Sequence, residues 1–278
     1  MMLDRPAGRW TLAFASAIGT SHLKSSTPCQ DAALCEVVED VRGNDVLLAA
    51  VSDGAGSAAQ SHEGSQFACR YFREWFGTWL LHNELAELTA DIVKEWIGRL
   101  QLQLQLLAED QDLKVRDYAC TMLAALAGSG KAAFFQVGDG AIVVANRSSP
   151  GAFRHVFWPQ RGEYENTTNF MTEDTATDVL DFQILDDEID EIALFTDGIQ
   201  GLVLHYASQT AHNLFFERRL RVLRSELQTG FSERVSLELA EYLNSERINE
   251  RTDDDKTLVL ASRRAADPVS RDAQESAN

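Results

Sequence analysis

Hydrophobic residues in this chain occur mainly in short, continuous runs bounded by glycine or polar residues. Val46–Val51 is the clearest run, because it is apolar throughout, β-branched at both ends and followed by a tip of small residues. Such a run is typical of a buried strand. Similar patterns predict strands at Trp10–Ser21, Ala32–Glu39, Cys120–Gly128, the two apolar runs within Lys131–Asn146, Phe153–Pro159, Val179–Leu185, Glu191–Gly198 and Lys256–Ser262.

Other segments space their apolar residues with a helical period. Helices are expected at Ser61–Leu81, Leu85–Asp110, Ser208–Gln228 and Ser232–Ser245. The first is expected to start at a capping box, Ser57-x-x-Gln60. It carries an aromatic stripe that is typical of core packing, formed by Phe67, Tyr71, Trp75 and Trp79. The second contains an alternating LQLQLQLL, but its flanking residues keep the helical period over a longer window.

The order of these elements predicts the fold class. Strands, two helices, strands, two helices and a last strand do not follow the βαβ alternation of a parallel sheet. They favour an α+β fold in which two packed antiparallel β-sheets are flanked by pairs of helices. One domain is expected over residues 10–262, after an N-terminal segment (1–9) and before a polar tail (263–278) that we expect to be disordered. The polar insert 160–178 is typical of a functional lid.

Charge narrows the classes of partner. The chain has 278 residues, with 43 Asp and Glu against 25 Lys and Arg, and a net charge of −18. This balance argues against nucleic acid or an anionic membrane as a partner, because both bind basic surfaces. An anionic substrate would also be repelled unless metal ions inverted the local field.

Cysteine spacing and the N-terminus point to the cytoplasm as the expected compartment. The four cysteines form no C-x-x-C pair and no dense pattern, which predicts reduced, buried thiols rather than a disulfide framework. The first ten residues lack the basic and apolar regions of a signal peptide, and no apolar run reaches the length of a membrane span. The GSGK sequence lies between two predicted strands, so a hairpin turn is expected there rather than a phosphate loop.

Aspartates recur at the ends of the predicted strands. VSDG, VGDG and FTDG each place an Asp-Gly pair after an apolar run. A single Asp-Gly is also a hairpin signal, and Asp139 alone fits a turn as well as a ligand. The TDDD sequence alone fits a solvated loop. Taken together, five positions suggest carboxylates gathered at one end of a sheet: Asp31, Asp53, Asp139, Asp197 and Asp254, or one of its neighbours Asp253 and Asp255.

Gathered carboxylates need cations, because like charges at close range are unfavourable. An oxygen-only ligand set without His or Cys at metal spacing suits Mg²⁺ or Mn²⁺ rather than Zn²⁺. Two such ions about 3.5–4 Å apart activate a water and stabilise both oxygens of an in-line displacement at phosphorus. The residues therefore favour metal-dependent phosphate chemistry.

The ordered motifs resemble a known family. VSDGAGS, FFQVGDGAIVV, ALFTDGI and DDKTLVL, with PCQDAAL and CTMLAAL between or before them, are similar to the metal-dependent serine/threonine protein phosphatases of type 2C. The resemblance extends from about Trp10 to Ser262. EYENTTNFMTED resembles the flap segment of a bacterial branch of that family.

The resemblance implies roles for the site residues. Asp53 would bridge two metal ions, Gly54 would contribute its backbone carbonyl, and Asp197 with Asp254 would complete one metal site. Asp31 would bind directly or through water, and it joins Asp53 as an expected catalytic residue. Asp139 would hold a third, weaker ion together with Asp197. Asp254 is preferred over Asp255 because Thr257 then aligns with the hydroxyl residue that usually opens the last strand.

Three positions depart from the family pattern. The acidic pair is Gln30-Asp31, so one carboxylate is missing. The phosphate-binding arginine is replaced by Ser26, which leaves His22 or Lys24 as substitutes. The histidine regarded as the general acid is Ala55, so a poor leaving group would take its proton from metal-bound water or another residue.

The leading hypothesis is a phosphomonoesterase acting on phosphoserine or phosphothreonine of a phosphorylated protein, with two Mn²⁺ or Mg²⁺ ions and a weaker third. The alternative is a pseudophosphatase that serves as a binding or scaffold module, motivated by the missing Arg and His. A calcium-binding protein fits poorly, since the regular EF-hand loop spacing is absent. The oligomeric state is not indicated.

Overall fold

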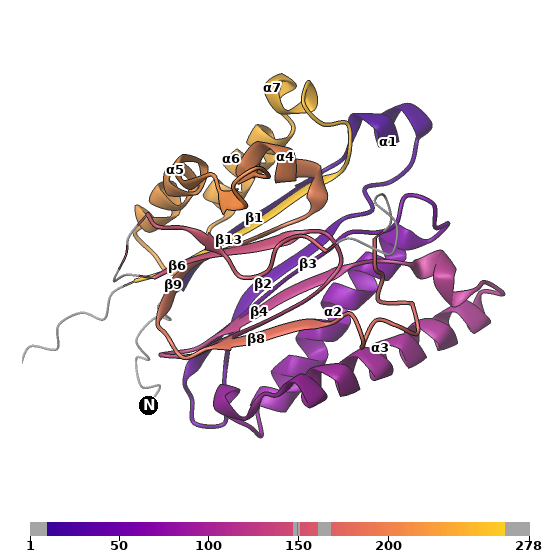
Figure 1. The fold of residues 1–278 in the computed structure, drawn as a ribbon, viewed down its shortest axis with the longest axis horizontal. Helices are drawn as coiled ribbons and strands as arrows, with labels where there is room; N and C mark the ends of the chain where they lie inside the picture. The colour runs from indigo at the N-terminus through magenta and orange to yellow at the C-terminus, as the bar shows by residue number, and fades with distance from the viewer. Residues whose placement is uncertain (1–9, 147–148, 150, 161–167, 265–278) are drawn as a thin grey trace, which may run out of the picture.

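The computed structural model describes residues 10–146, 149, 151–160 and 168–264. Its strands form two main sheets (Figure 1). The five-stranded sheet has the order β2 (Ala32–Glu39), β3 (Asp45–Ser52), β4 (Met122–Ala127), β5 (Ala132–Val137) and β8 (Asp181–Leu185). The six-stranded sheet has the order β12 (Gly230–Phe231), β1 (Trp10–Ala17), β13 (Lys256–Arg263), β9 (Ile189–Phe195), β6 (Ala141–Asn146) and β7 (Arg154–His155). All neighbours are antiparallel except β1 and β12.

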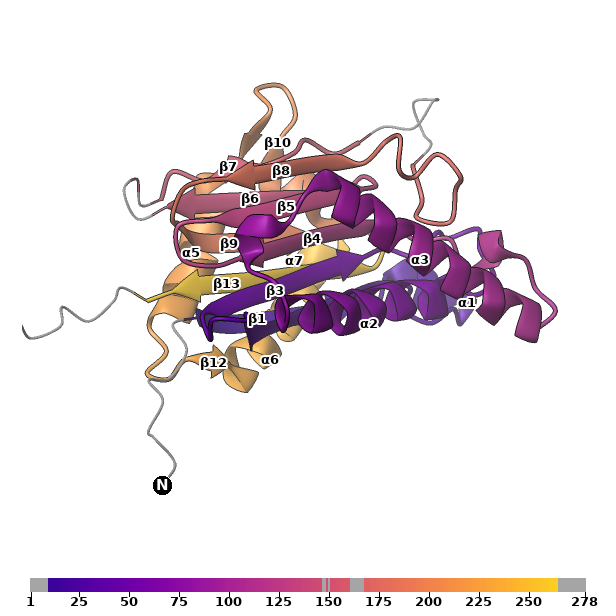
Figure 2. The ribbon, with the colours of Figure 1, turned by 90° about the horizontal axis from the view of Figure 1, so that it is seen from below.

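Each sheet is covered on its outer face by a pair of helices (Figures 1 and 2). Helices α2 (Ser61–Leu80) and α3 (Ala90–Asp110) pack on the five-stranded sheet. Helices α5 (Asn213–Arg224) and α6 (Glu233–Leu243) pack on the six-stranded sheet. The predicted fold class, an α+β sandwich of two antiparallel sheets flanked by pairs of helices, is confirmed.

Burial on both faces explains the continuous apolar runs of the central strands. In β3, Leu48 and Ala50 face α2 and α3, whereas Leu47, Ala49 and Val51 face the other sheet. Successive side chains of a strand point to opposite faces, so a strand between two apolar layers needs apolar residues at every position. This requirement places β3 at the centre of the molecule and sets the position of the residues that follow it.

The aromatic stripe of α2 lies at the rim of the core rather than at its centre. Phe72 and Phe76 are fully buried against Trp96 and Phe135. The predicted stripe residues pack against this cluster but stay partly exposed: Phe67, Tyr71, Trp75 and Trp79. The predicted capping box is wrong, because the helix starts after Gln60 and no side chain caps it.

Several predicted boundaries differ from the structure. Strand β1 ends at Ala17, and the following segment, expected to be a loop, contains helix α1 (Thr20–Ser25). The predicted strand at 153–159 is reduced to β7. The start of the helix predicted at 208–228 is instead part of a ribbon of β10 (Leu204–His205) and β11 (Thr210–Ala211).

The remaining described elements are short. They are the 3₁₀ turns η1 (Leu85–Glu87), η2 (Val115–Tyr118) and η3 (Asp197–Ile199) and the helices α4 (Gln200–Val203) and α7 (Glu246–Asn249). The GSGK hairpin is confirmed, since the Gly128 N–H donates to the Lys131 carbonyl (2.9 Å) between paired strands β4 and β5. All four cysteines are free thiols. Across the described ranges, no helix combines the length and apolar character needed to cross a membrane.

Candidate metal centre and active site

The five predicted aspartates come from loops at the same end of both sheets. Asp31 precedes β2, Asp53 follows β3, and Asp139 lies between β5 and β6. Asp197 follows β9, and Asp254 precedes β13. The Asp53 carboxyl interacts with that of Asp197, and Asp139 and Asp254 interact electrostatically with Asp197. The structure therefore brings together residues that are separated by more than 200 positions in the chain.

Burial and mutual repulsion raise the pKa of these carboxyls. Burial raises the pKa of Asp31 to about 8, opposed by hydrogen bonds from Thr196 and Thr257 and reinforced by nearby acidic groups. Burial, followed by the charges of Asp139 and Asp254, raises the pKa of Asp197 to about 6. The pKa of Asp53 lies well above its usual range, first because of burial and then because of Asp31 and Asp197. These carboxyls therefore bind protons more strongly than exposed carboxyls do.

Two oxygens in the cluster have no hydrogen-bond donor. Asp31 Oδ1 and Asp197 Oδ1 are both buried and unpaired. A buried carboxylate oxygen without a partner is costly, and native proteins normally satisfy such atoms with a donor, an ion or a water. Oxygen-only ligands of this kind suit Mg²⁺ or Mn²⁺. The donor set thus fits the hard divalent cations that the sequence predicts.

The side chains of the acidic cluster do not form a complete set of metal ligands in this arrangement. Within the parts of the chain that the structure describes, no group of three His, Cys, Asp or Glu side chains is already positioned to hold a metal ion. Asp53 and Asp197 interact with each other, and the charges of Asp139 and Asp254 act on Asp197. A cation among these groups would offset their mutual repulsion.

A buried lysine lies close to the cluster but does not neutralise it directly. The Lys256 side chain is fully buried, and burial lowers the pKa of its ammonium group, against the opposing influence of Asp255 and Asp254. Its Nζ donates to Asn249 Oδ1 (2.9 Å) and to the Ile18 carbonyl (3.4 Å). The ammonium is therefore held by neutral acceptors.

Threonine side chains hold the aspartates in place. The Thr196 hydroxyl donates to Asp31 Oδ2 (2.8 Å) and accepts from the Thr257 N–H (3.1 Å). Thr121 Oγ1 accepts from the Asp53 N–H (2.9 Å), and its own N–H donates to the Asp53 carbonyl (2.8 Å). Our sequence reasoning did not identify Thr121 or Thr196. The only signal for Thr196 is its place directly before Asp197.

Asp255 and Asp254 occupy opposite environments. Asp255 is buried, and its carboxylate accepts from the Gly19 N–H (2.6 Å) and the Gln30 N–H (2.5 Å) and lies 2.9 Å from His22 Nδ1. Asp254 is exposed, and its charge contributes to the raised pKa of Asp197 and of Asp139. Asp255 thus ties three segments together, whereas the Asp254 carboxylate accepts from the neighbouring Asp255 N–H (2.8 Å) and lies exposed beside the cluster.

Close backbone contacts explain the recurring Asp-Gly pairs. A Cβ on Gly54 would lie 2.6 Å from the Ser61 carbonyl oxygen, and one on Gly198 would lie 1.8 Å from that of Asp255. Real Cβ atoms do not approach backbone so closely, so any side chain would force these loops apart. The glycines therefore allow the loops that carry Asp53 and Asp197 to pack against neighbouring backbone.

The hairpin interpretation of Asp139 is wrong. Strands β5 and β6 lie in different sheets, so the loop that carries Asp139 crosses the sandwich. The Thr168 hydroxyl donates to Asp139 Oδ2, and the Gln200 side-chain amide donates to the Asp139 carbonyl. Thr168 belongs to the flap-like insert, whose residues 161–167 lie outside the described residues. The end of this insert thus contacts the acidic cluster.

The structure shows the surroundings of the residues that depart from the family pattern at the arginine and histidine positions. Ser26 ends α1 with a positive φ of 58°. His22 is held against Asp255, and Lys24 is exposed. Ala55 is nearly buried, and its N–H donates to the Ala119 carbonyl (2.9 Å). Of the two proposed substitutes for the arginine, Lys24 is the one without a described ion pair.

Comparison with known proteins identifies the family. A model of the protein phosphatase 2C family matches residues 18–244. The chain belongs to the protein phosphatase 2C family. It is 33% identical over 252 residues to serine/threonine-protein phosphatase 3 of Escherichia coli (strain K12), a match that covers 91% of this chain and 98% of the relative.

Solved structures share the type 2C fold. The serine/threonine phosphatase Stp1 from Staphylococcus aureus superposes with a TM-score of 0.61 at 16% identity, over 95% of this chain and all of that one. PppA of Pseudomonas aeruginosa, described as a regulatory component of its T6SS, superposes with a TM-score of 0.58 at 15% identity, over 93% of this chain and 99% of that one. At such low identity these likenesses show the fold alone.

We expect metal binding to stabilise the protein more strongly at higher pH. The pKa of Asp31 and of Asp197 rises from 3.8 in the unfolded chain to about 8 and about 6 in the metal-free fold. The fold then binds more protons than the unfolded chain, so its free energy of unfolding falls as pH rises through this window. Thermal unfolding with Mg²⁺ and with EDTA should show a larger metal-induced rise in Tm near pH 8 than near pH 6. An equal rise at both pH values would contradict this account.

Substitutions at the two neighbouring aspartates should have different effects on the free energy of unfolding. Asp255→Ala leaves the buried Gly19 and Gln30 N–H groups unpaired, so we expect the free energy of unfolding in EDTA to drop by about 2–4 kcal/mol. Asp254→Ala removes an exposed side chain and should change it by about 0.5 kcal/mol or less. Urea unfolding of both variants checks this difference, and equal losses would show that Asp255 does not clamp these segments.

Proposed function

We propose that this protein is a metal-dependent phosphomonoesterase that hydrolyses phosphoserine and phosphothreonine in phosphorylated proteins. The observation that carries the proposal is the cluster of buried, proton-retaining carboxyls with unpaired oxygens at Asp31 and Asp197. Family membership and the relative named a serine/threonine-protein phosphatase support the substrate class.

The proposed ligands are the carboxylates of the acidic cluster together with one backbone carbonyl. They are Asp31, Asp53, Gly54 (through its carbonyl), Asp139, Asp197 and Asp254. Two Mn²⁺ or Mg²⁺ ions, with a weaker third, would lower the pKa of a bound water and offset the negative charge of the phosphate. This also resolves how a protein of net charge −18 can attract an anionic substrate.

Hydrogen bonds from two threonines position the proposed ligands Asp53 and Asp31. The two hydrogen bonds between Asp53 and Thr121 fix the backbone that presents the Asp53 carboxylate. The Thr196 hydroxyl orients Asp31, so that its second oxygen stays free. Ala55 carries no proton donor at the position of the usual general acid, so the leaving group must be protonated by another source.

A pseudophosphatase is not favoured by these observations. A scaffold that had lost catalysis would not need to keep the four desolvated carboxyls of Asp31, Asp53, Asp139 and Asp197 together, since each raises the cost of folding. The proposed compartment is the cytoplasm, and the proposed catalytic domain spans residues 10–262. Strand β13 extends one residue beyond that boundary, to Arg263.

Asp53→Asn should abolish hydrolysis of p-nitrophenyl phosphate in the presence of Mn²⁺. The amide cannot balance the charge of two cations, so we expect kcat/KM to fall by about 10³-fold or more, the scale on which catalytic electrostatic groups act. Asp110→Asn, an exposed aspartate at the end of α3, is the matched control and should keep the wild-type rate. Equal rates in wild type and Asp53→Asn would refute the assignment.

A further inference from the structure

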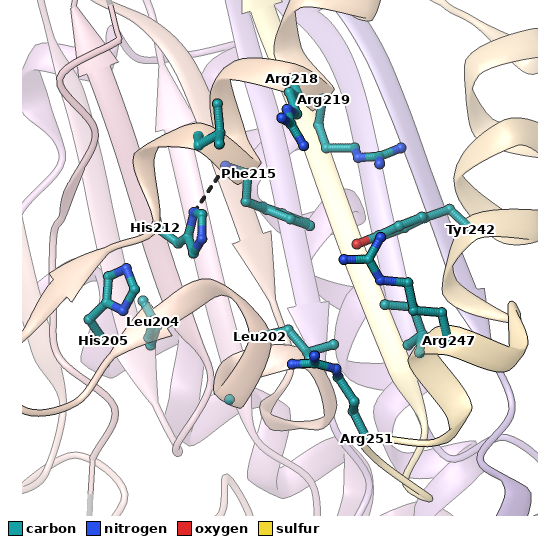
Figure 3. Close-up of a pocket in the computed structure, with 13 residues that line it drawn as sticks. Leu202, Leu204, His205, His212, Phe215, Arg218, Arg219, Tyr242, Arg247 and Arg251 are labelled. Carbon is teal, nitrogen blue, oxygen red and sulfur yellow. Dashed lines mark hydrogen bonds between the residues drawn. The ribbon is translucent and has the colours of Figure 1, made fainter.

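A groove with a strongly positive lining lies beside the acidic cluster. Its cavity of about 430 Å³ is bounded by the β10–β11 ribbon, α5, α6 and the α7 region (Figure 3). Its basic side chains are Arg218, Arg219, Arg247, Arg251, His205 and His212. Among the described residues that line this arginine groove, none is acidic. Such a surface is unexpected in a protein of net charge −18.

The guanidinium groups of the four arginines form no hydrogen bond or ion pair with other described residues. Elsewhere in the chain, Arg73, Arg224 and Arg234 form ion pairs with glutamates. Arg219 instead stacks over the Tyr242 ring (3.9 Å to its centroid), and its buried Nε has no hydrogen-bond partner. Guanidinium groups recognise carboxylates and phosphates through paired hydrogen bonds. These groups are therefore available to an anionic ligand.

The groove leads to the proposed catalytic site. A second cavity of about 350 Å³ is lined by Asp197, Gly198 and Thr252 and shares Gly201, Leu202 and Arg251 with the arginine groove. Asp197 belongs to the acidic cluster, so the two regions are joined through Arg251. A phosphopeptide whose phosphate lies at the acidic cluster would extend past Arg251 into the arginine groove.

The groove also has apolar lining residues. Leu202, Phe215, Tyr242 and Ile248 line it together with the basic side chains. A surface that combines apolar and cationic side chains suits a polypeptide, whose side chains supply both apolar contacts and charges. His212 adds a hydrogen-bond donor, because its Nδ1 accepts from the Phe215 N–H (3.2 Å) and its Nε2 then carries the proton.

We propose that the arginine groove binds acidic side chains that flank the phosphorylated residue of the protein substrate. The proposal rests on the phosphatase function proposed above and adds a sequence preference to it. The repulsion between the acidic enzyme and an acidic substrate is overcome locally, at the cluster by metal ions and in the groove by arginines. Substrates with glutamate or aspartate near the phosphosite should therefore be preferred.

The test compares phosphothreonine peptides that differ only in the flanking residues. One peptide carries alanines, a second carries three glutamates before the phosphosite, and a third carries three glutamates after it. We expect wild-type enzyme with Mn²⁺ to prefer one acidic peptide over the alanine peptide by about tenfold in kcat/KM, mainly through KM, as expected for a few exposed charge pairs. This preference should shrink as salt is raised.

A pair of matched double variants tests the location. Arg218→Glu combined with Arg247→Glu reverses two charges in the groove and should remove the preference. Arg70→Glu combined with Arg221→Glu reverses two exposed charges outside it, on α2 and α5, and should keep the preference. Both variants have the same net charge, and both should hydrolyse p-nitrophenyl phosphate at the wild-type rate.

The outcomes separate the two proposals. No hydrolysis of any substrate by wild type would refute the phosphatase function itself. Hydrolysis of all three peptides at equal rates would refute only the acidic preference. Equal loss of the preference in both double variants would refute the proposed role of the groove, since it would show that the overall charge of the enzyme determines the preference.

Discussion

The structure depends on one electrostatic constraint, which is that several carboxyls must share a small, largely buried space. Burial and then the charges of neighbouring acidic groups raise the pKa of Asp31, Asp53 and Asp197. Such an arrangement lowers stability unless a cation enters. The rest of the molecule compensates for this cost with two large apolar layers outside the sheets and a third between them.

The sandwich brings the acidic loops to one place and holds them rigidly. Asp53 follows the five-stranded sheet and Asp197 follows a strand of the six-stranded sheet, so their contact requires the two sheets to be packed in a fixed register. Asp255 reinforces this packing by binding the Gly19 and Gln30 N–H groups from two loops of the other end of the chain. Thr196 links Asp31 to the last strand through the Thr257 N–H. Stability and the candidate site are thus coupled through the same hydrogen bonds.

Sequence patterns predicted the parts of this arrangement that depend on local order. The run Val46–Val51 predicted a central strand because burial on both faces leaves a continuous apolar signal. The Asp-Gly repeats predicted the acidic cluster, although the reason for the glycines, close backbone contact at Gly54 and Gly198, needed coordinates.

Contacts that carry no local sequence signal could not be predicted. The roles of Thr121 and Asp255 depend on partners far away in sequence, and neither residue type is unusual in its local context. The arginine groove also combines α5 with the α7 region, so no local charge pattern indicates it. Its positive lining and the acidic cluster are opposite in charge, and the two regions are joined through Arg251.

Anomalous diffraction from crystals grown with Mn²⁺ tests the central claim most directly. The account predicts strong manganese peaks beside the Asp53 and Asp197 carboxylates. Crystals that contain Mn²⁺ but show no peak at the cluster would contradict it.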